Sequence, residues 1–192
     1  GLPEDFPEEK VNEFGLSLAR LLVSRMDGGK NHQPGLRMSN IGKPCERQLY
    51  YSINHSDKQE KLQPWVRMKF LFGDILEQVL LFLADASGHD VQGTQDEQEI
   101  EGIKGHRDAV IDGMVVDVKS ASSPAFKKFA EHRLEEDDSF GYVDQIQSYL
   151  YAAKDDDLVT NKTEAAFLVI DKTLGKVCLD IHEAKGFDYA AL

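Results

Sequence analysis

Cysteine is scarce in this chain of 192 residues, which has only Cys45 and Cys178. The two lie far apart in the sequence, and neither belongs to a Cys-x-x-Cys pair. The sequence therefore supports neither a zinc site nor a disulfide framework. We expect both residues to be buried thiols.

Long apolar runs are also missing. No stretch of eighteen apolar residues is present, and the most apolar segment, residues 70–84, is interrupted by Asp74, Glu77 and Gln78. No basic leader with a small-residue cleavage site opens the sequence. We expect a soluble, cytoplasmic protein with no membrane partner.

Positive charge is in short supply, because 22 Lys and Arg residues face 34 Asp and Glu residues, for a net charge of −12. This argues against a protein that holds nucleic acid by bulk electrostatics. The charge is uneven, however: residues 1–70 hold eleven bases and nine acids, and residues 71–192 hold eleven bases and twenty-five acids. Screening confines charge effects to about 8 Å, so a few bases can still line one groove while acids bind metals.

Hydrophobic periodicity predicts an α/β chain whose order is helices, three strands, two helices and two strands. No internal repeat or low-complexity linker divides it, so we expect a single domain over residues 1–192. Its mainly helical part is residues 1–85, and its sheet is in residues 95–182. The expected helices are 8–26, 44–53, 64–85, one beginning at Ser123-Pro124, and 141–154; the expected strands fall within 95–120 and at 165–171 and 176–182; residues 135–138 are expected to form a solvated loop.

Asp112-Gly113 lies between two β-prone runs, which predicts a hairpin with a two-residue turn. With these residues at the tip, Asp108 faces Asp117 and His106 faces Lys119 on the neighbouring strand. Alternation then divides the hairpin into two faces. The mostly apolar face holds Arg107, Ala109, Ile111, Met114, Val116 and Val118, and the other, ionisable face holds His106, Asp108, Val110, Val115, Asp117 and Lys119.

Two carboxylates opposed across a strand pair, with Cβ atoms roughly 4.5 to 5.5 Å apart, are destabilising unless something neutralises them. Mg²⁺ takes one or two carboxylates and keeps water ligands, which suits Asp108 and Asp117. Lys119, two residues on, can position water or stabilise a phosphate. The alternative is an exposed sheet face with a surface ion pair. On the metal reading, Asp117→Asn should relieve repulsion and stabilise the metal-free protein.

The pattern of Asp108 followed by Asp117-Val118-Lys119 resembles the PD-(D/E)XK nuclease superfamily. GDILE before the hairpin and QIQSY after it resemble its RecB-like branch, which includes phage exonucleases and CRISPR-associated RecB-like nucleases. Together these elements span roughly residues 39–152. The resemblance implies a restriction-endonuclease-like core, in which a central mixed β-sheet is flanked by helices and preceded by an N-terminal helical region.

The resemblance also implies residue roles. Asp108, Asp117 and the Val118 carbonyl would be ligands of Mg²⁺ or Mn²⁺. Glu77 would be a further metal ligand or a water-orienting base, and Lys119 would act on water or phosphate. By this analogy the catalytic residues are Asp108, Asp117, Lys119 and Glu77.

Helical spacing adds weight to two of these elements. Glu77 lies four residues after Gly73 in an otherwise apolar helix, where a carboxylate needs a partner, although a polar stripe with its neighbours is the alternative. Gln145 and Tyr149 are one turn apart and match the QxxxY element that the family uses near DNA; an ordinary core tyrosine is the alternative. His106 resembles the GHxD form of the second motif, in which it would support a metal ligand without binding the metal itself; a purely structural histidine is the alternative.

The segment MSNIGKPCERQLYY resembles the N-terminal region of RecB-like nucleases, where a cysteine can help to hold an iron–sulfur cluster. Such a cluster needs four cysteines, so we expect none here. Arg37, Arg47 and Tyr50 are candidates for DNA backbone contact and base stacking. For each of them, solvated surface is the alternative.

These features predict a metal-dependent DNA nuclease. The resemblance favours an exonuclease that acts on single-stranded DNA or on the ends of double-stranded DNA, in phage or recombination and repair processing. A structure-specific or nicking endonuclease is the nearest alternative. A non-catalytic DNA-binding or regulatory module on a nuclease fold is the alternative from another class, and protein partners stay open.

Overall fold

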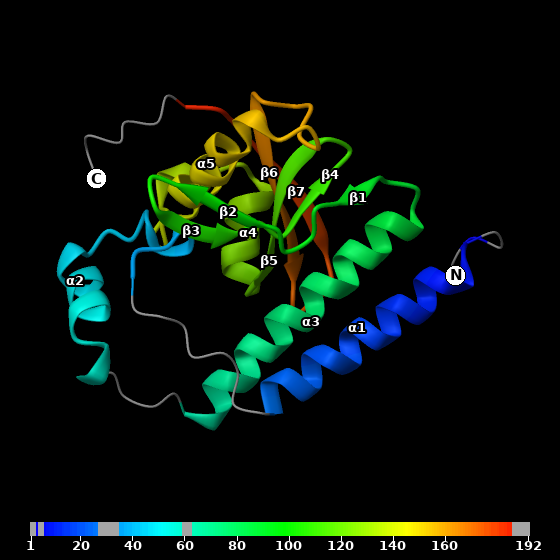
Figure 1. Ribbon diagram of the computed structural model, residues 1–192, viewed down its shortest axis with the longest axis horizontal. Helices are drawn as coiled ribbons and strands as arrows, with labels where there is room; N and C mark the ends of the chain where they lie inside the picture. Colours follow the sequence, from blue (N-terminus) through cyan, green and yellow to red (C-terminus); the bar gives the residue numbers. More distant parts are fainter. Residues whose placement is uncertain (1–2, 4–5, 27–34, 59–62, 186–192) are drawn as a thin grey trace.

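The computed structural model describes residue 3 and residues 6–26, 35–58 and 63–185. Figure 1 shows a central sheet with the long helices α1 and α3 along one side and α4 and α5 behind it. None of the helices in these ranges combines the length and apolarity that a bilayer crossing demands.

Three helices make up the N-terminal part: α1 (Glu8–Met26), α2 (Glu46–Asn54) and α3 (Pro64–Ala86). The predicted helix 8–26 is confirmed, whereas its predicted stop at 27–29 lies outside the described residues. α1 packs along α3 (Figure 1), where the rings of Phe14 and Phe82 stack with centroids 4.3 Å apart.

Helix α2 stands apart from the rest of the molecule at the left of Figure 1. It has no buried residue, and Tyr50 and Tyr51 are both exposed. Cys45, at the N-terminus of α2, is exposed too, so the expectation of a buried thiol is wrong there. Cys178 is half-buried, and burial raises the pKa of its thiol.

Five strands form the main sheet in the order β1-β4-β5-β6-β7, and β2 pairs with β3 in a separate two-stranded sheet. β5 and β6 run parallel and the other pairs are antiparallel, so the predicted mixed sheet flanked by helices is confirmed. The strands are β1 (Val91–Gln92), β2 (Glu97–Ile100), β3 (Ile103–His106), β4 (Ala109–Ile111), β5 (Met114–Ala121), β6 (Glu164–Asp171) and β7 (Val177–Glu183). Residues 95–120 thus form four strands, one more than predicted.

Helices α4 (Ser123–Ala130) and α5 (Tyr142–Ala152) lie between β5 and β6 in the sequence. α4 begins at Ser123 with proline in its first turn, as the Ser123-Pro124 signal predicts, and Ser122 occupies the N-cap position without a side-chain capping bond. The predicted helix 141–154 is shorter, because a 3-10 turn, Ala153–Asp155, follows α5. The predicted loop 135–138 contains part of another such turn, Leu134–Glu136.

Both faces of the sheet are packed. Val110 and Val115 belong to a large core shared with α4 and α5, which includes Phe129 and Ile146. On the opposite face, Ala109 and Val118 pack with Leu80 and Leu81 of α3. The predicted ionisable face is therefore apolar at its turn end, and only the end far from the turn carries the charged residues.

The hairpin register is confirmed for three pairs: Ile111 with Met114, Val110 with Val115, and Ala109 with Val116. Pairing stops there, so Asp108 lies just outside the ladder instead of directly opposite Asp117. His106 pairs with Glu97 of β2, and its predicted pairing with Lys119 is wrong.

Arg107 accounts for the break between β3 and β4. Its side chain is 2% exposed, and its guanidinium donates to Asp156 Oδ2 at 2.5 Å and Asp96 Oδ2 at 2.8 Å. A buried guanidinium needs such partners, since an unpaired buried charge is costly. The chain therefore leaves the ladder at Arg107, which separates β2 and β3 from the main sheet.

Candidate active site

Three carboxylates from distant parts of the sequence meet where α3 crosses the end of the hairpin. Glu77 comes from α3, Asp108 from the β3–β4 junction, and Asp117 from the middle of β5. The charge of Asp117 acts on both Glu77 and Asp108, and the charge of Glu77 acts on Asp108. The structure thus brings together the predicted acidic residues, although without the predicted ladder pairing.

Asp108 is held by the strand next to it. Its Oδ2 accepts a hydrogen bond of 2.7 Å from the Val118 backbone N–H. This contact places the carboxylate beside Asp117 even though the ladder has ended. Burial, followed by the charges of Asp117 and Glu77, raises the pKa of Asp108 well above its usual value.

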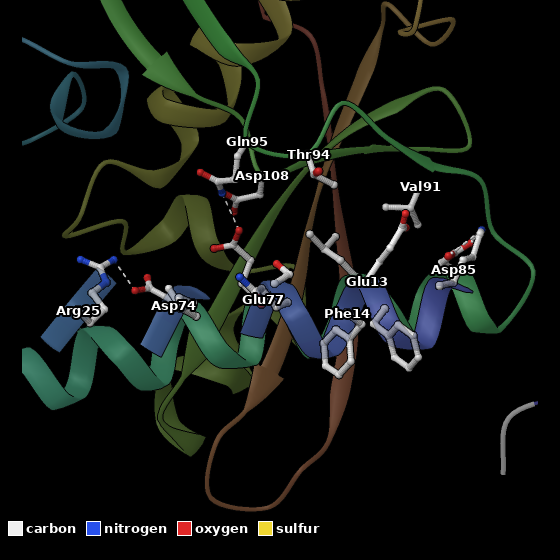
Figure 2. Close-up of a pocket in the computed structure, with 16 residues that line it drawn as sticks. Glu13, Phe14, Arg25, Asp74, Glu77, Asp85, Val91, Thr94, Gln95 and Asp108 are labelled. Atoms are coloured by element: carbon white, nitrogen blue, oxygen red, sulfur yellow. Dashed lines mark hydrogen bonds and ion pairs between the residues drawn. The ribbon is translucent and has the colours of Figure 1, made fainter. Parts of the chain in front are cut away.

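Glu77 is the acidic residue of α3 that turns toward the hairpin, as Figure 2 shows. Its Oε1 accepts a hydrogen bond of 2.6 Å from Gln95 Nε2. Burial raises the pKa of Glu77 to about 7, and the negative charges of Asp117 and Asp74 add to this effect. Glu77 therefore keeps its proton to a higher pH than an exposed glutamate does in the absence of metal.

Lys119 is the counter-ion of this acidic group. Its Nζ lies 2.5 Å from Asp117 Oδ2, and its side chain is 19% exposed. Burial alone would lower the pKa of Lys119, but the charges of Asp117 and Asp108 outweigh it and raise the pKa. The ammonium also lies 4.9 Å from the ring centroid of Tyr142. A charged lysine is thus fixed beside the carboxylates.

Gln145 of α5 joins the two ends of this ion pair. Its Nε2 donates to Asp117 Oδ1 and its Oε1 accepts from Lys119, both at 3.3 Å. Tyr149, one turn further, is 3% exposed and lies in the same cleft. Burial raises the pKa of Tyr149 to about 12.

Gly105 of β3 allows Tyr149 to approach. A Cβ at position 105 would lie 2.8 Å from both the Tyr149 hydroxyl and the Met38 Cβ. Any side chain at Gly105 must therefore displace its neighbours. Tyr149 is buried as its core alternative predicts, yet it also lines the candidate site.

A cleft of about 660 Å³ opens over these residues. Five Lys and Arg side chains line it against four Asp and Glu side chains, which is an unusual balance in a protein with a net charge of −12. The five bases are Arg37, Lys69, Lys104, Lys119 and Lys172. A local basic surface therefore surrounds the acidic centre.

Arg37 and His106 line this cleft, as their predicted roles require. The Nε atom of Arg37 is buried and has no hydrogen-bond partner among the described residues. His106 is exposed at the end of β3, close to Asp108 in sequence and in the cleft. Arg47 and Tyr50 are not among the residues that line the cleft; they lie on α2, where Arg47 stacks over Tyr51.

A second cleft, of about 850 Å³, lies between α1, α3 and the β1–β2 loop (Figure 2). It shares Asp74, Glu77 and Asp108 with the first cleft. Arg25 of α1 forms an ion pair with Asp74 at its edge. The candidate site is therefore open on two sides.

Sequence reasoning missed Gln95 and the bases Lys69, Lys104 and Lys172. Lys69 has a signal, because it lies four residues before Gly73 and eight before Glu77 on one helical face. Gln95 has none: it belongs to no motif, and its approach to Glu77 and Asp108 depends on a loop whose backbone is left-handed at this residue, with φ of 58°.

The donor set suits a hard divalent cation. Carboxylate oxygens are the ligands that Mg²⁺ and Mn²⁺ prefer, and one lysine does not neutralise three acids. In the described part of the chain no group of three or more His, Cys, Asp or Glu side chains is arranged so that it could hold a metal ion. An open site that keeps positions for water and substrate is what Mg²⁺ commonly takes, so the residues fit such an ion.

No family model matches the chain, and no curated protein matches its sequence. Among solved structures, it is similar to an alkaline exonuclease from Laribacter hongkongensis, with a TM-score of 0.53 and 15% identity over 87% of this chain and 82% of that one. The chain shares the fold of this exonuclease.

A second structure of the Laribacter enzyme, in complex with dAMP, gives a TM-score of 0.53 at 14% identity over 80% of this chain and 79% of that one. A phage-related exonuclease from Haemophilus somnus gives 0.48 at 13% identity over 80% and 86%. The likeness to the Laribacter enzyme establishes the fold alone, while membership of the RecB-like branch stays a prediction.

Proposed function

We propose that this chain is a divalent-metal-dependent DNA nuclease that hydrolyses phosphodiester bonds. The observation that carries the proposal is the meeting of Glu77, Asp108 and Asp117 beside the charged, buried Lys119. Three acids and one lysine in a cleft with basic walls match the needs of phosphodiester hydrolysis, namely metal ligands, an electrostatic group and a path for the substrate backbone.

Glu77, Asp108 and Asp117, with the Val118 carbonyl, would hold Mg²⁺ or Mn²⁺. When bound, such an ion polarises the phosphate and lowers the pKa of a water molecule. Lys119 then holds the attacking water or stabilises charge on the scissile phosphate. Gln145 keeps the Lys119 ammonium oriented through its bond of 3.3 Å.

The walls of the cleft carry the side chains that would bind DNA. Arg37 lines the cleft, and its guanidinium can donate charge-assisted hydrogen bonds to a phosphate oxygen. Lys69, Lys104 and Lys172 offer further backbone contacts. Arg47 and Tyr50 would reach DNA only where it extends beyond the cleft to α2. Tyr149 would act only by orienting Gln145 and the substrate.

Exonuclease action on DNA ends, in phage or recombination and repair processing, is the mode that we favour, because the fold is that of an alkaline exonuclease. The second cleft favours an endonuclease as the other candidate. It meets the first at Glu77 and Asp108, so the groove does not end at the catalytic residues. A DNA strand that has no free end can lie across such a site.

Linear, nicked and closed-circular DNA, each incubated with Mg²⁺, Mn²⁺ or EDTA, test the proposal. We expect nucleotide release from linear DNA with metal and none with EDTA, and no cleavage by Asp108→Asn in either condition. Cleavage of closed circles would favour the endonuclease. Binding without cleavage of any substrate would favour a non-catalytic DNA-binding module, and full activity in EDTA would contradict metal dependence.

A further inference from the structure

Gln95 bridges two of the three carboxylates. Its Nε2 lies 2.6 Å from Glu77 Oε1 and 3.4 Å from Asp108 Oδ1. Figure 2 shows the Gln95 amide beside Glu77 and Asp108, two residues that line both clefts. One neutral donor group thus faces two oxygens that are otherwise candidates for the same cation.

The loop that carries Gln95 is tied to the Asp108 backbone. The Gln95 N–H donates to the Asp108 carbonyl and the Arg107 N–H donates to the Asp96 carbonyl, both at 3.2 Å. The buried Arg107 guanidinium also donates to the Gly93 carbonyl at 3.2 Å. A Cβ at Gly93 would lie 2.5 Å from that guanidinium, so the loop is closely packed. The backbone therefore fixes where the Gln95 side chain starts.

A cation that bridges Glu77 Oε1 and Asp108 Oδ1 from the side of the Gln95 amide needs the space that the amide nitrogen occupies. Mg²⁺ binds oxygen at about 2.0 to 2.1 Å, and a positively charged ion repels the partly positive amide hydrogens. The amide must therefore turn away before Glu77 and Asp108 close on a metal. Its fixed backbone leaves the side-chain torsions as the route for this movement.

We propose that Gln95 is a built-in substitute for the metal, which donates hydrogen bonds to the two carboxylates of the empty site and is displaced when the ion binds. It acts through Glu77 and Asp108, so it is a positioning residue that tunes metal affinity. The inference rests on the proposed metal site. Every ion that bridges Glu77 and Asp108 must displace the amide, and this cost lowers the affinity of the site for the ion.

Gln95→Ala tests this with Mn²⁺ as the probe, by titration calorimetry on the whole chain and by thermal melts in EDTA. We expect Mn²⁺ to bind about tenfold more tightly to the variant, because a hydrogen bond to a charged group no longer has to be broken. The metal-free variant should melt at a lower temperature than the wild type. A residue with a merely structural role would lower the melting temperature without raising the affinity.

A second variant of Gln95 and a control variant of Gln92 accompany Gln95→Ala. Gln95→Asn shortens the side chain by one methylene and suits the left-handed backbone, so it should behave as Gln95→Ala does, even if alanine impairs folding. Gln92→Ala is the matched control, because the side-chain amide of Gln92 donates a hydrogen bond of 2.6 Å to Asp90 outside the site. It should leave Mn²⁺ affinity unchanged.

The outcomes separate this inference from the proposed function. Wild-type protein that binds Mn²⁺, with equal or weaker binding by both Gln95 variants, would overturn the role of Gln95 and leave the metal site in place. Wild-type protein that fails to bind Mn²⁺ at all would contradict the metal site and, with it, both proposals.

Discussion

Asp108→Asn should stabilise the metal-free protein. The asparagine oxygen can still accept the hydrogen bond from the Val118 N–H, which is 2.7 Å long in the native chain. The substitution removes a charge that repels Asp117 and Glu77 in a buried setting. At an effective dielectric constant of 20, two like charges about 4 Å apart repel by about 4 kcal/mol, and the repulsion falls in inverse proportion to their distance. Attraction to Lys119 offsets part of this, which leaves a gain of about 1 kcal/mol.

Asp117→Asn should act in the opposite direction. From the hairpin register alone, either aspartate could be neutralised to relieve repulsion. In the structure, however, Asp117 is the ion-pair partner of Lys119 at 2.5 Å, and the lysine is only 19% exposed. Removal of one partner from a buried pair costs about 3 to 5 kcal/mol, and the remaining charge of Asp108 reduces this to about 2 kcal/mol.

Thermal melts of both variants in EDTA measure these effects. For a chain of this length, 1 kcal/mol corresponds to a shift of about 2 to 4 °C, so Asp108→Asn should melt above the wild type and Asp117→Asn below it. Excess Mn²⁺ should stabilise the wild type and leave both variants almost unchanged. If the two variants shift in the same direction in EDTA, the assignment of the ion pair to Asp117 and Lys119 is wrong.

The melts also have a pH dependence whose sign is fixed. Burial raises the folded-state pKa of Glu77 to about 7, above its ordinary value of 4.5, so the folded protein binds this proton more tightly than the unfolded one. The free energy of unfolding of the metal-free wild type should therefore fall as pH rises through 7. Part of that fall should disappear in Asp117→Asn, because the negative charge of Asp117 is one of the causes that raise the pKa of Glu77.

Three further expectations follow from single contacts. Lys119→Ala should reduce turnover about 10²- to 10³-fold while Mn²⁺ binding, measured by calorimetry, stays nearly intact; unchanged turnover would remove Lys119 from the mechanism. Gly105→Ala should displace the Tyr149 ring and lower the free energy of unfolding, measured by chemical denaturation, by about 1 to 3 kcal/mol. An unchanged free energy of unfolding would show that the ring can move freely. A hydrogen bond with the buried Asp180 raises the pKa of His182 above its ordinary value of 6.5. The stability that this pair contributes is therefore complete below pH 6.5 and is lost as pH rises through the folded-state pKa of His182. Asp180→Asn should therefore destabilise the protein more at pH 6 than at pH 8, and a larger loss at pH 8 would count against the pair.

The sequence was informative where local rules decide the structure. Asp112 and Gly113 both have positive φ, 50° and 78°, so the two-residue turn and the three pairs beside it could be predicted. The spacing of Gly73 and Glu77 placed both residues correctly on the cleft side of α3. In each case a few neighbouring residues determine the geometry.

The prediction failed where a distant residue competes with the ladder. Alternation would have carried the hairpin to His106 and Lys119, but Arg107 finds its partners in Asp96 and in Asp156, which is 49 residues away. The ladder therefore ends at Ala109, and His106 joins β2. No pattern within the hairpin contains that information, since the partner comes from beyond α5.

Net charge was the main objection to a DNA-binding protein, and the structure shows why it is a weak guide here. The charge of −12 is a sum over the whole chain, whereas a phosphate responds to charges within a Debye length of about 8 Å. Arg37, Lys69 and Lys172 come from three distant segments, and only the fold places them around one cleft. Phosphate contacts should therefore depend on these few side chains, and their loss should weaken binding far more than their share of the total charge suggests.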